Sequence, residues 1–247
     1  MYAARVRAEA LALLHRGESL SAAARATGVA RSTIREWRDG EPGTGPGTCP
    51  RCDDLPIDEE AYAALLGFYL GDGYIARAAR YSFLRITCDL AHPGIIDDVV
   101  DLLGRIRPGG KVFTVKKSGC VDLQLNWQHL TCLFPQHGPG RKHTRRITLE
   151  PWQQKIVSTH PGPLLRGLFH SDGCRVNNWA TRVVGGQKKR YDYGRWQFVN
   201  HSDDIRDLCT WALDLVGIPW RQSSWKTISV SRRDAVAALD ALIGPKT

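Results

Sequence analysis

The chain has 247 residues, enough for one large domain or for two or three small ones. Its 43% hydrophobic and 24% charged residues are typical of a globular protein, which argues against a wholly disordered chain. The formal net charge of +9 favours a polyanionic partner, of which nucleic acid is the most common, although a basic protein without such a partner has the same composition.

The start of the chain has no apolar stretch of the kind that makes a secretory signal, because Arg5, Arg7 and Glu9 interrupt it. The longest apolar run, residues 61–70, is shorter than the about 20 residues that a membrane-spanning helix needs. Seven cysteines with one close pair argue against a disulfide framework. We therefore expect a cytoplasmic protein of bacterial type, associated with the nucleoid and without a membrane partner.

Residues 1–40 are predicted to form a small domain of three short helices. Apolar residues recur at helical spacing in the first segment, and a second short helix ends at a tight turn around Gly28. Ser32 is predicted to N-cap a third, basic helix that carries Ile34 and Trp37 on its inner face.

This order of helices, with a glycine turn before the basic helix, resembles the helix-turn-helix of resolvases and transposases. In that family the last helix enters the major groove and its early residues contact base edges. The resemblance implies base contacts from Arg31, Ser32, Thr33 and Arg35, and a phosphate contact from Arg38. A three-helix bundle without a DNA partner is the alternative.

Residues 41–57 are predicted to be a linker, because residues 40–48 are rich in glycine and proline. Cys49 and Cys52 follow with the C-x2-C spacing that supplies half of a tetrahedral Zn²⁺ site. The other five cysteines are isolated in the sequence. A reduced turn with two buried thiols is therefore the alternative to zinc.

The rest of the chain, residues 58–247, contains a duplication. Leu65–Gly73 is matched by Leu165–Gly173, 100 residues later, and the same order of hairpin, amphipathic helix, hairpin and helix follows each copy. Alternating polar and apolar residues predict antiparallel sheets with one buried and one solvent-exposed face, and hence an α+β fold. The predicted strands are residues 84–90, 111–117, 121–127, 196–200 and 225–231, and the predicted helices are residues 92–106, 203–217 and 234–243.

The two nine-residue motifs and the order of elements resemble the LAGLIDADG family over residues 58–247. The resemblance implies two pseudo-symmetric αββαββα repeats with saddle-shaped sheets, which we place at residues 58–144 and 145–247. Leu70 and His170 replace the first Asp of the family's motif. Asp72 and Asp172 keep the second Asp, which is the metal ligand in the family.

The spacing of small residues predicts that the two motif helices pack against each other. Gly67 and Gly71 lie four residues apart, as do Gly167 and Ser171, and small residues at this spacing let helix backbones approach closely. Each motif helix has little polar surface, so its natural partner is the other one.

Asp72 and Asp172 follow these helices, with Gly73 and Gly173 predicted as left-handed caps. A carboxylate at the negative end of a helix dipole loses about 0.3–1 kcal/mol, and two neighbouring carboxylates repel each other. A divalent cation bound between them would remove both penalties. Oxygen-only ligation favours Mg²⁺ over Zn²⁺ for this pair.

In the family's endonucleases the wet faces of the sheets lie along the major groove. The resemblance therefore implies DNA contacts from Arg85, Thr87, Lys116, Gln124 and Asn126 in the first repeat, and from Arg195, Gln197, Thr227 and Ser229 in the second. Family enzymes also place a basic residue near the attacking water and the phosphate. The resemblance assigns that catalytic role to Lys142, and Lys246 is the corresponding residue of the second repeat. The alternative is that the segment around Lys142 is a solvated linker that touches phosphate non-specifically.

The resemblance implies a homing-type endonuclease that hydrolyses phosphodiester bonds of double-stranded DNA with Mg²⁺. In this interpretation the helix-turn-helix lengthens the DNA sequence that the enzyme recognises. A transcription regulator that has lost cleavage is the main alternative, and an intron splicing factor is a third. No small-molecule substrate is evident from the motifs. We expect a monomer, because tandem repeats already place a pseudo-dimer in one chain.

Overall fold

A computed structural model describes residues 4–39, 48–78 and 81–247. The chain divides into two compact units, Met1–Ile57 and Asp58–Thr247. Residues 41–47 of the predicted linker lie outside the described residues, and residues 48–57 are described. In the described ranges, no helix is both long enough and apolar enough to cross a bilayer.

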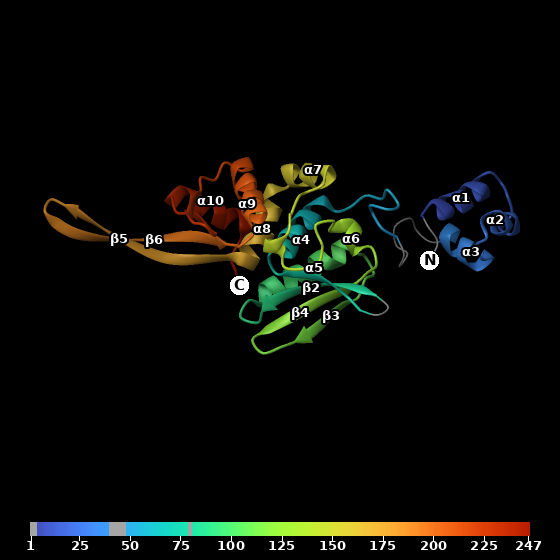
Figure 1. Ribbon diagram of the computed structural model, residues 1–247, viewed down its shortest axis with the longest axis horizontal. Helices are drawn as coiled ribbons and strands as arrows, with labels where there is room; N and C mark the ends of the chain where they lie inside the picture. The colour runs from blue at the N-terminus through green and yellow to red at the C-terminus, as the bar shows by residue number, and fades with distance from the viewer. Residues whose placement is uncertain (1–3, 40–47, 79–80) are drawn as a thin grey trace. The chain divides into compact units, whose positions relative to one another are not determined.

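The N-terminal unit contains three helices, α1 (Ala4–His15), α2 (Leu20–Thr27) and α3 (Arg31–Asp39), drawn in blue in Figure 1. Ile34 lies in its core and Trp37 packs against it, as predicted, and Ala23 of α2 also lies in this core. Gly28 ends α2 with a φ of +69°, a backbone conformation that favours glycine. The predicted N-cap at Ser32 is wrong, because α3 has already begun there with the N–H of Ile34 donating to the carbonyl of Ala30.

The larger unit confirms the predicted α+β class and the αββαββα order, repeated twice. Each repeat has a four-stranded antiparallel sheet, with strand orders β1-β2-β4-β3 and β5-β6-β8-β7. The first repeat contains α4 (Glu59–Gly71), β1 (Gly73–Arg77), β2 (Ser82–Asp89), α5 (Pro93–Ile106), β3 (Val112–Lys116), β4 (Cys120–Asn126), α6 (Leu130–Leu133) and the 3-10 turn η1 (Lys142–Thr144). The second contains α7 (Pro151–Thr159), α8 (Pro161–Asp172), β5 (Gly173–Val184), β6 (Gln187–Val199), α9 (Asp203–Leu215), β7 (Arg221–Ser224), β8 (Thr227–Val230) and α10 (Arg233–Ile243).

Helices α4 and α8 form the centre of the larger unit and lie side by side between the two sheets (Figure 1). Residues 61–70 of α4 are all buried, which explains why this segment has no polar face. The alternating residues of β2 and β4, such as Leu84 and Leu123, are fully buried on the inner face of the first sheet. The buried helices α4 and α8 therefore form the junction of the two repeats.

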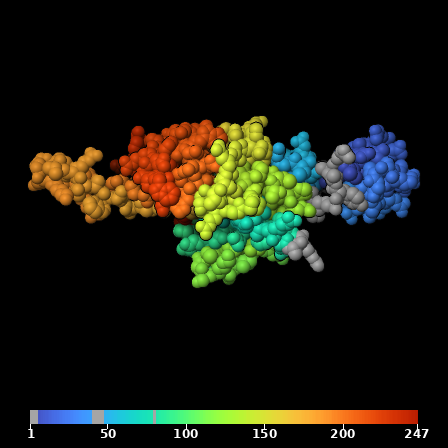
Figure 2. All heavy atoms as spheres, viewed as in Figure 1, coloured from blue at the N-terminus to red at the C-terminus, as the bar shows by residue number. Residues whose placement is uncertain are grey.

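The second repeat differs from its prediction in the hairpin β5–β6. The predicted strand at residues 196–200 is only the inner end of a hairpin with twelve residue pairs, from Gly173↔Phe198 to Val184↔Gln187. Residues 181–193 are exposed on both faces, so they lack the apolar alternation by which a strand is detected. Figure 2 shows this hairpin as a narrow extension of the unit.

Candidate functional site

The two motif helices touch backbone to backbone. A Cβ atom on Gly67 would lie 2.9 Å from the Cα of Gly167, and a Cβ on Gly167 would lie 2.9 Å from the Cα of Gly67. One turn later, a Cβ on Gly71 would lie 2.5 Å from the Cβ of Ser171 and 3.4 Å from Oδ2 of Asp172. The small residues therefore bring together the carboxyl ends of both helices, as the spacing predicted.

Gly73 and Gly173 are needed for a different reason than predicted. Neither has a positive φ, and Gly173 is extended, with φ −96° and ψ 151°. The chain turns from each helix straight into a strand, and a Cβ on Gly173 would lie 2.7 Å from the Cα of Phe169. A Cβ on Gly73 would lie 2.5 Å from the Cα of Tyr69. The left-handed caps were wrong, and close approach of strand and helix explains both glycines.

The carboxylates of Asp72 and Asp172 lie close enough to influence each other. Burial, followed by the negative charge of Asp72, raises the pKa of Asp172 to about 6. Partial burial also raises the pKa of Asp72, although this residue reaches the surface. Both acids therefore ionise less readily than ordinary carboxyl groups.

Two lysines occupy the ends of the same helices. Nζ of Lys142 donates to the carbonyls of Tyr69, Leu70 and Gly71, the last two at 3.0 and 2.7 Å. Burial lowers the pKa of Lys142 to about 8, while the charges of Asp172 and Asp72 oppose this shift. A cation at the carboxyl end of α4 compensates the helix dipole.

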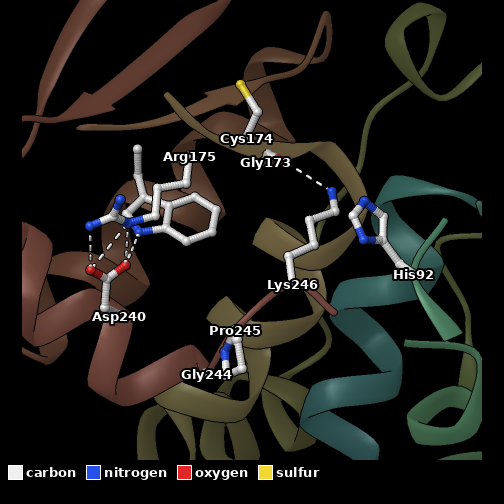
Figure 3. A pocket seen from close by; sticks show the side chains of 9 residues that line it. His92, Gly173, Cys174, Arg175, Asp240, Gly244, Pro245 and Lys246 are labelled. Carbon is white, nitrogen blue, oxygen red and sulfur yellow. Dashed lines mark hydrogen bonds and ion pairs between the residues drawn. The ribbon is translucent and has the colours of Figure 1, made fainter. Parts of the chain in front are cut away.

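Lys246 has the corresponding place at the end of α8. Its Nζ donates to the carbonyl of Gly173 at 2.9 Å and to that of Ser171 at 3.5 Å. Figure 3 shows this side chain pointing toward Gly173 in a pocket that His92 also lines. Two carboxylates and two ammonium groups thus share the junction of the motif helices.

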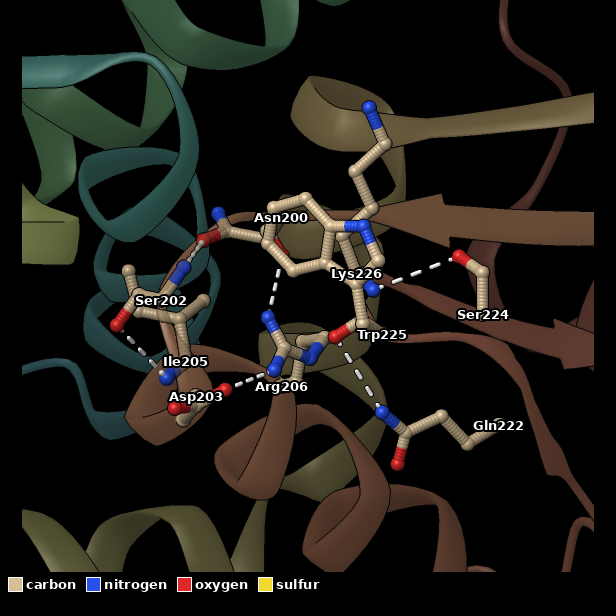
Figure 4. A network of polar contacts seen from close by, with 9 residues as sticks. All are labelled: Asn200, Ser202, Asp203, Ile205, Arg206, Gln222, Ser224, Trp225 and Lys226. Carbon is tan, nitrogen blue, oxygen red and sulfur yellow. Dashed lines mark hydrogen bonds and ion pairs between the residues drawn. The ribbon is translucent and has the colours of Figure 1, made fainter.

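Asn200, which the sequence did not single out, fixes the orientation of Asp172. Its Nδ2 donates to Oδ2 of Asp172 at 2.6 Å, and its Oδ1 accepts the N–H of Ser202 at 2.8 Å. Arg206 donates to the backbone carbonyl of Asn200 at 2.6 Å (Figure 4). Because Oδ1 is engaged by a backbone donor, the amide must point its NH₂ group at the carboxylate.

The first repeat has no such amide at the matching position. Gly73 pairs with Ile86, and Gly173 pairs with Phe198, so Cys88 corresponds to Asn200 in the hairpin register. Burial, and then the charge of Asp72, raises the pKa of the Cys88 thiol to about 12. The two acids therefore have different neighbours.

The outer face of the first sheet carries some of the predicted DNA contacts. Arg85 lies opposite Gln124 in the pairing of β2 with β4, and both side chains are half-buried. Lys116 instead lies opposite Val121, which belongs to the buried face. Lys116 is exposed but lies on the opposite face from Arg85, because a one-residue change of register turns a side chain to the other face. Its DNA contact stays a prediction. Thr87, which pairs with Asp122, and Asn126, which pairs with Phe83, lie on the same outer face as Arg85 and Gln124.

The outer face of the second sheet keeps Arg195 and Gln197, which are half-buried in β6. Thr227 is 8% exposed and Ser229 is 1% exposed, so their predicted DNA contacts are wrong. Both lie on β8, which is enclosed between β6 and β7. Ser229 donates to the carbonyl of Trp196, an internal contact that explains its polar side chain.

In the N-terminal unit, the predicted reading helix presents four of its five proposed residues to solvent. Arg31, Ser32, Arg35 and Arg38 are exposed, and Thr33 is half-buried. Arg31 donates to Oγ of Ser21 at 3.1 Å, and Arg38 forms an ion pair with Asp39 at 2.7 Å. Within residues 4–39, Arg35 forms no hydrogen bond or ion pair.

Residues 1–44 match the family model of a homeodomain-like domain. No curated protein matches the chain. Similar solved structures include I-DmoI in complex with DNA and Mn, with 14% identity, a TM-score of 0.49, and coverage of 76% of this chain and 99% of that chain. I-AabMI bound to uncleaved DNA has 13% identity, a TM-score of 0.47, and coverage of 73% and 82%. The N-terminal LAGLIDADG domain of DUF199/WhiA has 12% identity, a TM-score of 0.44, and coverage of 76% and 83%.

Cys49 and Cys52, the predicted half of a Zn²⁺ site, lie in the N-terminal unit. Cys49 is buried but Cys52 is exposed, so the alternative of two buried thiols does not hold.

Proposed function

We propose that this chain binds double-stranded DNA at a specific sequence and cleaves it with a divalent cation held by Asp72 and Asp172. In this proposal residues 58–247 form a LAGLIDADG-type core, with repeats at residues 58–144 and 145–247, and the homeodomain-like segment lengthens the recognised site. The observation that carries the proposal is the junction of α4 and α8, where two helices in backbone contact bring both carboxylates into mutual influence.

The donor set at this junction fits a divalent cation. The raised pKa of Asp172 reflects burial and like charge, and a bound cation would oppose both effects. Carboxylate oxygens are the ligands that Mg²⁺ prefers. When bound, the cation would polarise the phosphate and stabilise the oxygen that leaves.

The chain's own residues have distinct proposed roles. Asp72 and Asp172 would hold the cation, and Asn200 fixes the orientation of the Asp172 carboxylate. Lys142 lies within electrostatic reach of both acids, and its pKa of about 8 allows proton transfer near neutral pH. Arg85 and Gln124, on the outer face of the first sheet, are proposed to contact the DNA.

A sequence-specific regulator without cleavage is the second candidate. The observation that favours it is the pair of lysines, because Lys142 and Lys246 already place positive charge beside the two carboxylates. Such a junction is compensated electrostatically even without a cation. In that case the core would serve only as a DNA-binding scaffold beside the homeodomain-like segment.

The two candidates are separated by a cleavage assay with the full chain. Duplex DNA from the chain's own chromosomal neighbourhood would be incubated with Mg²⁺ and with the wild type, an Asp72→Asn/Asp172→Asn variant, or an Asp97→Asn control on the exposed face of α5. Metal-dependent double-strand cleavage that only the Asp72→Asn/Asp172→Asn variant loses supports the nuclease. Equal metal-independent binding without cleavage supports the regulator, and absence of specific binding overturns both.

We also propose that Zn²⁺ binds Cys49 and Cys52, whose C-x2-C spacing supplies half of a tetrahedral site. The purified protein should contain about one zinc per chain, and Co²⁺ substitution should give the absorption of a tetrahedral thiolate site. Cys52→Ser should lose the metal, whereas Cys174→Ser, an exposed cysteine outside this pair, should keep it. Equal metal content in both variants would contradict the assignment.

A further inference from the structure

The hairpin β5–β6 is far longer than its counterpart in the first repeat. Hairpin β1–β2 has five residue pairs, whereas β5–β6 has twelve. We call its outer part, residues 177–194, the distal hairpin. A two-stranded ribbon that exposes both faces has no core of its own, so both of its faces remain open to a partner.

The distal hairpin is built to keep its shape in isolation. Gly185 and Gly186 form its two-residue turn with φ values of +59° and +76°, the combination that suits the twist of a tight hairpin. Nδ2 of Asn178 donates to the hydroxyl of Tyr193 at 3.1 Å across the strands. The guanidinium of Arg190 lies 5.2 Å from the ring centre of Trp179. These pairs order the ribbon before any partner binds.

The two faces of the distal hairpin carry different charges. Residues that lie opposite each other in an antiparallel pair share a face, so Arg182 and Lys189 lie on one face with Tyr191 and Tyr193. We call this the outer face, because it continues the face of Arg195 and Gln197; it carries no acidic residue between residues 174 and 197.

The opposite face is partly neutralised. Asp192 lies there opposite Trp179 and forms an ion pair with Arg190 at 2.7 Å. Lys188 shares this face. Net positive charge without internal compensation is therefore concentrated on the outer face of the hairpin.

We infer that the outer face of the distal hairpin binds the phosphate backbone of DNA beyond the half-site of the second repeat. This inference rests on the proposed DNA-binding function. Two uncompensated cations and two tyrosine hydroxyls match the acceptor oxygens of phosphates. An extended strand rises about 3.4 Å per residue, and DNA rises about 3.4 Å per base step. The six residue steps from Arg195 to Lys189 therefore extend the contact by about 20 Å, or about six base pairs.

Adjacent lysines provide a matched test. Lys188→Ala and Lys189→Ala remove the same charge at neighbouring positions on opposite faces. Each phosphate contact contributes about 0.9 to the slope of log K against log salt concentration. Lys189→Ala should lower that slope by about 0.9 and Arg182→Ala/Lys189→Ala by about 1.8, whereas Lys188→Ala should leave it unchanged. Equal slopes for both single variants would overturn the inference.

A shortened hairpin gives an independent readout. Deleting residues 179–184 and 187–192 keeps the Gly185–Gly186 turn between the paired residues Asn178 and Tyr193. The removed residues are mostly exposed, so the thermal midpoint should be unchanged. Hydroxyl-radical footprints should shorten by about six base pairs on one side only.

The outcomes separate this inference from the proposed function. A specific footprint of the wild type that the deletion does not shorten overturns only the role of the hairpin. Absence of any specific footprint overturns the DNA-binding function itself. Retained binding to an acidic protein or to RNA, without a DNA footprint, would assign the outer face to another polyanion and contradict the inference.

Discussion

Replacing Asp172 by Asn should stabilise the cation-free protein at pH 8. The folded-state pKa of Asp172 is about 6, above the ordinary value of 3.8, because the carboxyl is buried beside Asp72. A raised acid pKa contributes stability that is present below about pH 4 and is lost as the pH rises through about 6. A shift of about two pKa units corresponds to about 3 kcal/mol, which is the upper limit of the gain expected at pH 8. An amide at position 172 keeps an oxygen that can accept the hydrogen bond from Asn200.

The measurement is urea denaturation in EDTA at several pH values between about 4 and 8, comparing wild type with Asp172→Asn. Burial lowers the pKa of His170 to about 4, which makes stability fall as the pH drops below about 6.5, but both proteins share this effect and it cancels in the difference. The gain should be near zero at pH 4 and largest at pH 8. A difference that is independent of pH would refute the reasoning. Mg²⁺ at about 100 times its Kd should then stabilise the wild type by about 2.7 kcal/mol and the variant by much less.

Three further predictions concern the helix junction, the amide and the reading helix. Gly67→Ala should destabilise the protein by about 1–3 kcal/mol, because its Cβ meets backbone. Gly104→Ala, whose Cβ meets open space, should not destabilise it in this way, and equal midpoints in denaturant for the two variants would contradict this. Asn200→Ala should raise the pKa of Asp172 further and weaken Mg²⁺ binding measured by calorimetry; unchanged affinity at pH 6 would argue against its positioning role. Arg35→Ala should cost about 1–3 kcal/mol at one base position, and a uniform loss across all sequences would show that Arg35 touches only phosphate.

The sequence predicted the centre of this molecule well because the constraint there is strict. Two helices in backbone contact tolerate only the smallest residues at the positions of Gly67 and Gly167. The glycines at these positions therefore indicate the helix contact in the sequence itself. The residue types alone did not reveal why positions 73 and 173 are glycines. A left-handed cap and a close strand both require the absence of a side chain, and only the observed backbone angles distinguish them.

Features that depend on register or on distant partners could not be predicted. Lys116 and Phe113 lie on opposite faces of β3, and the pairing with β4 decides which face each side chain takes. Asn200 acquires its role from a hydrogen bond to a residue 28 positions away. The distal hairpin shows no apolar alternation because it buries neither face. These properties arise from pairing and contacts, which periodicity in one chain does not encode.

The two repeats are pseudo-symmetric in backbone but not in chemistry, and this has a consequence for any DNA target. Asp172 receives a hydrogen bond from Asn200, which favours its ionised form, whereas the corresponding Cys88 offers Asp72 only a buried thiol with a raised pKa. The longer hairpin lies in the same repeat as the better supported acid. If each repeat contacts one half of the DNA, the halves are bound through different groups and over different lengths. A palindromic site would leave these differences unused, so the preferred site should be asymmetric, with its longer arm under the second repeat.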